Sequence, residues 1–372
     1  MLFGKKSKDI TKERVLAALS HVDDPDLKKD LVTLNMIEGL VIDGKKVSFS
    51  VVLTTPACPM KEAIQSACIN AIKLMVDAEA EVSVKMTSRV SADTTNQTLP
   101  NIKNIVAISS GKGGVGKSTL SANLAVSLAQ SGAKVALLDA DIYGPSLPLM
   151  FGFQGERPRM QEIGGRDMLI PFEKHNVKLM SIGVLVGSGQ AIVWRGPMAS
   201  KALRQLIFDT YWGEIDYLLL DLPPGTGDIH LTLVQALPLT GAVVITTPQK
   251  VAVDDASKGA DMFSNPQIGV PVLGVVENMS YFVPSDAPDK KYKLFGEGGG
   301  QKLADALRAP LLAKIPMREG VVDSGDKGVP AVAGDDPIMR EAFHTLSQKL
   351  AQQIAIRNAQ RPPTSPVEVS IP

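Results

Sequence analysis

The segment that most constrains this chain is the glycine-rich run Gly-Lys-Gly-Gly-Val-Gly-Lys-Ser at residues 111–118. An apolar run precedes it at residues 105–108, and apolar residues recur at helical spacing through residues 120–129. This order predicts a strand, a loop and a helix, the context that a phosphate-binding Gly-x-x-x-x-Gly-Lys-Ser loop requires. Glycines let backbone N–H groups turn toward phosphate oxygens, and the helix N-terminus adds partial positive charge. The run therefore indicates a nucleotide site rather than an ordinary turn.

Two side chains of this loop have defined chemistry. The ammonium group of Lys117 is placed to reach the β- and γ-phosphates, and the hydroxyl of Ser118 is placed to bind Mg²⁺. The guanine-reading pattern Asn-Lys-x-Asp is absent from the chain, so ATP is the expected nucleotide. The predicted nucleotide-binding residues of the loop are Gly111, Lys112, Gly113, Gly114, Val115, Gly116, Lys117, Ser118 and Thr119.

Length and composition set the broad class. The chain has 372 residues, enough for two domains, and its 44% hydrophobic and 21% charged residues suit a globular protein. Lys+Arg and Asp+Glu are 39 each, which argues against non-specific binding to nucleic acid or a membrane surface. No apolar run approaches a membrane span, and the start lacks a signal-peptide core. Two cysteines give no disulfide framework, so we expect a cytoplasmic location.

Patterning divides the chain into four parts: a small α+β domain at 1–90, a linker at 91–101, an ATPase domain at 102–358 and a flexible tail at 359–372. In the first part, Thr11 can cap a helix that runs through Ala18. Strands are expected at 39–42 and 46–53 around an Asp-Gly turn, and an edge strand at 81–86. Between them lies a predicted helix whose apolar face comprises Ile64, Ala67, Cys68, Ala71, Ile72 and Met75.

Acidic residues follow two apolar runs of the second domain. Residues 134–138 lead into Asp139-Ala140-Asp141, and residues 217–220 lead into Asp221, which fits the Walker B pattern and would hold Mg²⁺ through water. Carboxylates at the carboxyl ends of parallel strands point into the ligand crevice of an open α/β sheet. Further strands are expected at 241–246, 272–276 and 311–315. The predicted fold is a doubly wound, mostly parallel P-loop sheet with helices on both faces.

Lys112, directly after the first glycine, gives the loop the deviant form that resembles the MinD, ParA and nitrogenase-iron-protein class of P-loop ATPases. The resemblance implies that Lys112 reaches across a homodimer interface to the partner's nucleotide. It also implies that Asp141 orients the attacking water, that Asp139 supports the metal region and that Asn278 reads the adenine edge. The segment that begins at Pro316 is a second candidate to flank the base.

A set of motifs narrows the resemblance. Asp-Pro-Asp-Leu at 24–27 and Thr-Thr-Pro-Ala-Cys-Pro-Met at 54–60 match a small domain associated with iron–sulfur cluster assembly. They occur together with the segments 139–146, 221–228 and 277–280 of the second domain. This set resembles the Mrp-type ATPases, cytosolic carriers of iron–sulfur clusters. The resemblance implies an ATP-hydrolysing homodimer that delivers clusters to recipient apoproteins, with a [4Fe–4S] cluster as a cofactor in the family.

The chain departs from that family in its cysteines. The family commonly has a Cys-x-x-Cys soon after the Asn-Met-Ser segment, but residues 281–288 here read Tyr-Phe-Val-Pro-Ser-Asp-Ala-Pro. Four-thiolate ligation at that place is impossible, so either a cluster binds elsewhere or the protein assists assembly without holding one. Cys58 is the candidate ligand, because the helix that follows it favours a thiolate, although a small buried turn residue is an equal reading. Cys68 is expected to pack in the core, and the four histidines show no metal-ligand spacing.

A MinD- or ParA-like ATPase that acts as a spatial or assembly switch, without a cluster, is the alternative. MinD-like members end in a basic amphipathic helix, whereas residues 357–363 break at proline and have little apolar face. ParA-like members need a basic patch, which the zero net charge does not favour. The carrier reading is therefore the main hypothesis, and it rests on family analogy.

Overall fold

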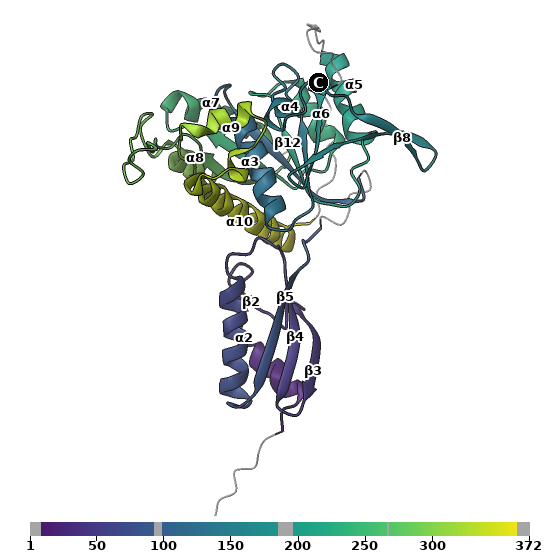
Figure 1. Cartoon of the computed structure of the whole chain (residues 1–372), viewed down its shortest axis with the longest axis vertical. Coiled ribbons are helices and arrows are strands. Elements are labelled where there is room, and N and C mark those ends of the chain that lie inside the picture. The colour runs from purple at the N-terminus through teal and green to yellow at the C-terminus, as the bar shows by residue number, and fades with distance from the viewer. Residues whose placement is uncertain (1–8, 93–98, 185–195, 266–267, 363–372) are drawn as a thin grey trace, which may run out of the picture. The chain divides into compact units, whose positions relative to one another are not determined.

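The computed structural model describes residues 9–92, 99–184, 196–265 and 268–362 (Figure 1). The chain divides into two compact units, Met1–Ser91 and Ala92–Pro372, which are described separately. Of the part expected as a flexible tail, residues 363–372 lie outside the described residues, and residues 359–360 belong to the last helix.

The first unit is a small three-stranded sheet covered by helices. The strand order is β3-β4-β5, with β3 antiparallel and β5 parallel to β4. A parallel neighbour needs a crossover, and the helix α2 between β4 and β5 provides it. The predicted small α+β unit is confirmed. Its elements are α1 (Lys12–Leu19), β1 (Asp23–Asp24), β2 (Lys29–Asp30), β3 (Ile37–Asp43), β4 (Lys46–Leu53), α2 (Lys61–Met75) and β5 (Glu81–Ser88).

The helices of this unit begin and pack for reasons visible in the sequence. The Thr11 hydroxyl accepts a hydrogen bond from the backbone N–H of Arg14, 3.4 Å away, and so caps α1. On α2, Ile64, Cys68 and Ile72 are buried at successive turns, as the periodicity predicts. The expectation that Met75 shares this face is wrong, since its side chain is 50% exposed at the last turn of the helix.

The second unit is built on an eight-stranded sheet in the order β10-β11-β7-β12-β6-β13-β14-β15. Seven strands are parallel, and only the edge strand β10 is antiparallel to its neighbour. The predicted mostly parallel sheet is confirmed. Its strands are β6 (Ile102–Ser110), β7 (Val135–Asp139), β10 (Phe172–Lys174), β11 (Val177–Ser181), β12 (Ile215–Asp221), β13 (Gly241–Thr246), β14 (Val272–Glu277) and β15 (Leu311–Lys314).

Helices cover both faces of this sheet. Helix α3, which follows the glycine-rich loop, packs with α10 against one face, and α7 and α8 pack against β13 and β14 on the other. Two helices between β11 and β13, α5 and α6, also pack on each other. The longer helices are α3 (Lys117–Gln130), α5 (Gly196–Phe208), α6 (Asp228–Ala236), α7 (Lys250–Ser264), α8 (Gly299–Leu307) and α10 (Pro337–Gln360), and the shorter ones are α4 (Leu147–Met150), η1 (Ile182–Val184), α9 (Gly320–Asp326) and η2 (Ala331–Ala333).

A two-stranded ribbon, β8 (Arg159–Ile163) and β9 (Arg166–Ile170), extends from this unit (Figure 1). It was not expected from the sequence, because nearly every residue of β8 is exposed and the strand lacks apolar alternation. By contrast, every residue of β12 is buried, which explains its continuous apolar run. No helix in the described part of the chain is long and apolar enough to span a membrane.

Candidate nucleotide site

The glycine-rich loop joins β6 to α3 at the carboxyl edge of the sheet. Gly114 and Gly116 have φ values of +81° and +79°, which side-chain-bearing residues rarely adopt. Gly111 lies against α7, where a Cβ atom would stand 2.0 Å from the carbonyl carbon of Asp255. The loop therefore needs glycine for its backbone conformation at two positions and for close packing at a third.

The glycine-rich loop with the start of α3 and the carboxylate that ends β12 are joined by side-chain contacts in this structure. The Nζ atom of Lys117 lies 3.0 Å from Oδ1 of Asp221, and the Lys117 side chain is only 7% exposed. Ser118 Oγ donates to Oδ2 of Asp221 over 2.6 Å, and Ser121 Oγ donates to Oδ1 over 2.7 Å. A hydroxyl and a buried carboxylate side by side are the hard oxygen ligands that Mg²⁺ takes, so these residues fit that ion.

A second buried carboxylate lies beside Asp221. The parallel register of β7 and β12 pairs Asp139 with Asp221. Asp139 accepts hydrogen bonds from Ser181 Oγ at 2.9 Å and from the backbone N–H of Leu147 at 3.2 Å. Burial and the neighbouring Asp221 raise the pKa of Asp139 to about 8, while the charge of Lys117 acts in the opposite direction. This concentration of buried acidic groups suits a cation, but the support of Asp139 for a metal stays a prediction.

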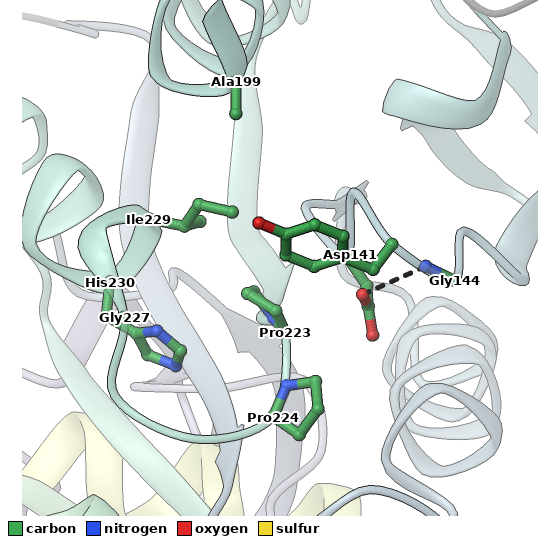
Figure 2. Close-up of a pocket in the computed structure, with 9 residues that line it drawn as sticks. Asp141, Gly144, Ala199, Pro223, Pro224, Gly227, Ile229 and His230 are labelled. Atoms are coloured by element: carbon green, nitrogen blue, oxygen red, sulfur yellow. Dashed lines mark hydrogen bonds between the residues drawn. The ribbon is translucent and has the colours of Figure 1, made fainter. Parts of the chain in front are cut away.

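Asp141 follows Asp139 in the turn and is less buried. Its Oδ1 accepts a hydrogen bond from the backbone N–H of Gly144 at 3.2 Å, and its Oδ2 lies 3.8 Å from Lys117 Nζ. The carboxylate lines a pocket of about 570 Å³ together with Pro223, Pro224 and other residues (Figure 2). It is thus close to the lysine expected to contact phosphate and open to a cavity, as water orientation requires.

The segments expected to flank the base meet next to the loop. The side-chain amide of Asn278 donates to the backbone carbonyl of Val115 over 2.7 Å. A Cβ atom on Gly116 would stand 2.4 Å from that amide nitrogen, so loop and amide are tightly fitted. Pro316 is buried and follows Ile315, whose carbonyl accepts from the N–H of Ser280 at 3.0 Å. The adenine-reading role of Asn278 and the base-flanking role of Pro316 stay predictions.

Other predicted residues occupy distinct positions. Lys112 is exposed at the loop surface, whereas Val115 is buried and Thr119 lies in the first turn of α3. In the first unit, the sulfur of Cys58 was expected to be favoured as a thiolate by the helix that follows it. Instead, burial and the carboxylates of Asp26 and Asp24 raise the pKa of Cys58, and the backbone N–H of Met60 only partly opposes this. That expectation is corrected.

The site also contains residues that were not predicted. Ser121 lies one helical turn after Ser118, so its spacing offered a signal. Ser181 reaches Asp139 only because β11 pairs with β7, and nothing in the local sequence indicates that pairing. His230 is 1% exposed and lines the same pocket as Asp141, although the spacing of the four histidines indicated no site for it.

Residues 281–288, where the family resemblance led us to look for paired cysteines, make other contacts in this structure. Phe282 forms a bridge with Tyr292, and Arg318 donates from Nη1 to the carbonyls of Val283 and Pro284 at 2.8 and 3.2 Å. Within the described ranges, no group of three or more His, Cys, Asp or Glu side chains is arranged to hold a metal ion.

Comparisons with known proteins bear on both units. Residues 101–354 match the family described as NUBPL iron-transfer P-loop NTPase, and residues 12–85 match the family of iron–sulfur cluster assembly proteins. An iron–sulfur cluster carrier protein of Synechocystis sp. is 46% identical over 351 residues, 93% of this chain and 99% of that protein. The carrier protein of Escherichia coli K12 is 39% identical over 368 residues, 98% of this chain and 97% of that protein.

A solved structure is also similar. It is a nucleotide-binding protein from Archaeoglobus fulgidus in complex with ADP, 36% identical and with a TM-score of 0.57. The match covers 68% of this chain and 98% of that one. The matched part of this chain is about as long as a P-loop domain, and the matched protein is in complex with a nucleoside diphosphate.

Proposed function

This chain belongs to the NUBPL iron-transfer P-loop NTPase family, and from that premise we propose that it binds and hydrolyses ATP with Mg²⁺ to deliver iron–sulfur clusters to apoproteins. The resemblance to cluster-carrier ATPases inferred from the motifs is confirmed by the family match and by relatives that cover nearly the whole chain. The main support for this proposal is that Lys117 and Ser118, at the end of the glycine-rich loop, both contact the carboxylate of Asp221.

Each residue of the site has a separate role in nucleotide binding or hydrolysis. Backbone N–H groups of the loop donate to phosphate oxygens, aided by the N-terminus of α3. Lys117 leaves Asp221 to contact the phosphates, and each charge-assisted contact is worth about 1.5–3 kcal/mol. Ser118, and Asp221 through water, would hold Mg²⁺, which would neutralise charge at the phosphates. Asp141 orients the attacking water.

Lys112 is assigned a role between subunits. Its side chain is exposed at the surface of the loop, as a lysine that acts on a neighbouring nucleotide needs to be. In an ATP-dependent homodimer, Lys112→Ala should lose turnover, and mixtures with Asp141→Asn subunits should deviate from a simple average. Strict additivity in such mixtures, or a monomer in every nucleotide state, speaks against this role.

The cluster is cargo, and Cys58 is the proposed protein ligand. It is one of two cysteines in the chain, and the other, Cys68, has no exposed surface. Burial raises the pKa of Cys68 to about 11, so a thiolate there is strongly disfavoured. The pKa of Cys58 is raised too, but the residue is only part-buried, and an iron ion lowers a thiol pKa on binding. Further thiolates come from another subunit or from glutathione.

Anaerobic reconstitution with iron and sulfide tests the carrier role. Wild type and Cys68→Ala should take up iron and show cluster absorbance, and should pass the cluster to an apo-ferredoxin. Cys58→Ser should lose the absorbance and keep ATP hydrolysis, because the nucleotide site lies in the other unit. Equal iron in Cys58→Ser and wild type removes Cys58 as the ligand. If no variant takes up iron, an assembly factor without a cluster becomes the better description, and lipid and DNA co-sedimentation with ATP then tests the spatial switch.

A further inference from the structure

The side-chain amide of Asn278 is bonded to the glycine-rich loop itself. Its Nδ2 donates to the backbone carbonyl of Val115 over 2.7 Å, and Asn278 is 8% exposed. Because a carbonyl oxygen only accepts, the group that faces it is the NH₂ end of the amide. One N–H of Asn278 is therefore committed to the loop, and this contact is separate from any contact that the other N–H and Oδ1 make with a base.

The contact with Asn278 fixes the direction of one peptide unit of the loop. The peptide bond between Val115 and Gly116 is planar and trans, so its C=O and its N–H point in opposite directions. Asn278 holds the carbonyl oxygen, and the N–H of Gly116 therefore points away from Asn278. Gly116 is also the N-cap of α3, with a φ of +79°, and glycine itself offers little resistance to turning. A restraint from another segment is what gives this peptide unit one orientation.

The loop has backbone donors that such a restraint orients. In the part of the chain that the structure describes, four successive N–H groups donate to no protein acceptor, namely those of Gly113, Gly114, Val115 and Gly116. Backbone N–H groups need a partner or water, and in a loop of this kind a phosphate oxygen is the partner. Orienting these donors before the phosphate arrives removes an ordering cost from binding.

The backbone that carries Asn278 is firmly held by the sheet. Asn278 follows β14 directly, and its own N–H donates to the carbonyl of Thr246 at the end of β13 over 2.8 Å. The N–H of Ser280 donates to the carbonyl of Ile315 over 3.0 Å. Met279 between them has a φ of +53°, which a residue with a side chain rarely adopts and which persists only where the surrounding structure determines it. The sheet therefore sets the position of the amide, and the loop adjusts to it.

We propose that Asn278 is a positioning residue for phosphate binding. It holds the carbonyl of Val115 on the side away from the phosphates, so that the N–H of Gly116 and the N–H groups before it are aimed at the phosphates, whatever the base of the nucleotide. The inference rests on the proposed function, since it assumes a nucleoside triphosphate in the loop. It goes beyond reading of the adenine edge, because that role concerns the base alone. The two roles predict different results for a ligand that has phosphates and no base.

Calorimetric titration of the full-length protein with inorganic tripolyphosphate and Mg²⁺ separates the two roles. Asn278→Leu keeps the branched shape of the side chain and removes its donor. It should weaken tripolyphosphate binding about threefold to tenfold, which is the contribution of one hydrogen bond. GTP affinity should fall by the same factor, and ATP affinity by at least as much. Asn278→Ala is a second variant without the donor and should show the same pattern.

Asn104→Leu is the matched control. Asn104 is 1% exposed, and its Nδ2 also donates to a backbone carbonyl, that of Asp216, over 3.1 Å. It lies near the start of β6, whereas the glycine-rich loop follows the end of that strand. Asn104→Leu should lower the thermal midpoint of the nucleotide-free protein and change tripolyphosphate affinity by no more than about twofold. A loss of tripolyphosphate affinity that occurs only in the Asn278 variants therefore reports on the loop rather than on stability.

Three outcomes overturn the inference and leave the proposed function standing. If both Asn278 variants bind tripolyphosphate as wild type does and lose affinity for ATP alone, Asn278 only reads the base. If Asn104→Leu loses as much tripolyphosphate affinity as the Asn278 variants, the effect belongs to stability. If wild type binds ATP but not tripolyphosphate, the loop is not oriented for phosphates alone. A wild type that binds neither ligand removes the proposed function, and this inference with it.

Discussion

Lys117 Nζ lies 3.0 Å from Oδ1 of Asp221, so the lysine of the glycine-rich loop is bonded to the carboxylate that ends β12. Asp221 also has Asp139 as its register partner on β7, and both carboxylates are buried. Lys117 therefore neutralises part of an acidic pair. When the lysine moves to a phosphate, the pair needs another cation, and this physical link explains why nucleotide and Mg²⁺ binding are expected to be coupled.

Replacing Lys117 should remove phosphate binding. One or more charge-assisted contacts, each worth about 1.5–3 kcal/mol, are lost in Lys117→Ala, so ATP affinity should fall about 10- to 150-fold. Calorimetric titration with ATP measures this. Lys103→Ala is the control, because Lys103 pairs with Asp216 at the opposite end of the strand and should leave ATP affinity within about twofold. Equal affinities in the two variants contradict the assignment.

Asp141→Asn should separate binding from chemistry. An amide keeps the size of the side chain and loses the charge that orients water, so turnover should fall about 100-fold or more while ATP affinity changes little. Phosphate release and calorimetry measure the two quantities. Asp167→Asn, an exposed position on β9, is the control. Turnover at the wild-type rate would take Asp141 out of the catalytic step.

The packing of the loop on α7 predicts that alanine substitution will affect thermal stability differently at two of its glycines. A Cβ atom on Gly111 would meet the Asp255 carbonyl carbon at 2.0 Å, whereas on Gly113 its nearest neighbour would be Pro224 Cγ at 3.9 Å. Gly111→Ala should therefore lower the thermal midpoint of the nucleotide-free protein by several degrees, and Gly113→Ala should not. Equal midpoints, measured by calorimetry, would mean that α7 moves aside at little cost.

Glu277 predicts a stability effect away from the phosphates. Its carboxylate accepts from Ser280 Oγ at 2.5 Å and from the N–H of Gly300 in the first turn of α8 at 2.6 Å. Glu277→Ala leaves both donors unpaired in a buried place and should lower the free energy of unfolding by about 2–4 kcal/mol. Both tryptophans belong to the second unit, so urea unfolding followed by fluorescence reports on it. Glu297→Ala, at an exposed ion pair, should change little.

The buried ring of His230 predicts a pH dependence. Burial lowers its pKa from 6.5 to about 4. Between pH 6.5 and 4, the ring therefore binds a proton in the unfolded chain but not in the folded one. Stability should therefore fall as pH drops from about 6.5 toward 4, by at most about 3 kcal/mol from this group. Unfolding of wild type and His230→Phe across this range gives the difference. Parallel pH profiles for the two proteins would contradict the assignment.

Much of the fold could be predicted because the signals are local. The glycine-rich run, the helix after it, and the apolar runs that end at Asp139 and Asp221 each lie within about a dozen neighbouring residues. The strand at 241–246 was predicted at its observed bounds. The ribbon β8–β9 and the strand β11 were missed, because exposed or short strands are defined by their pairing partners rather than by their own periodicity.

The sequence by itself determined the nucleotide motifs, the family and the alternation of strands and helices, since each depends on residue types at short spacing. Only the tertiary structure decided that Asp139 lies beside Asp221, that Ser181 bonds to Asp139 and that His230 turns into the pocket of Asp141. These relationships depend on the order and register of strands that are far apart in the chain. Burial then sets the chemistry, because a low-dielectric surrounding shifts the pKa of Asp139 upward and that of His230 downward in ways that spacing does not encode.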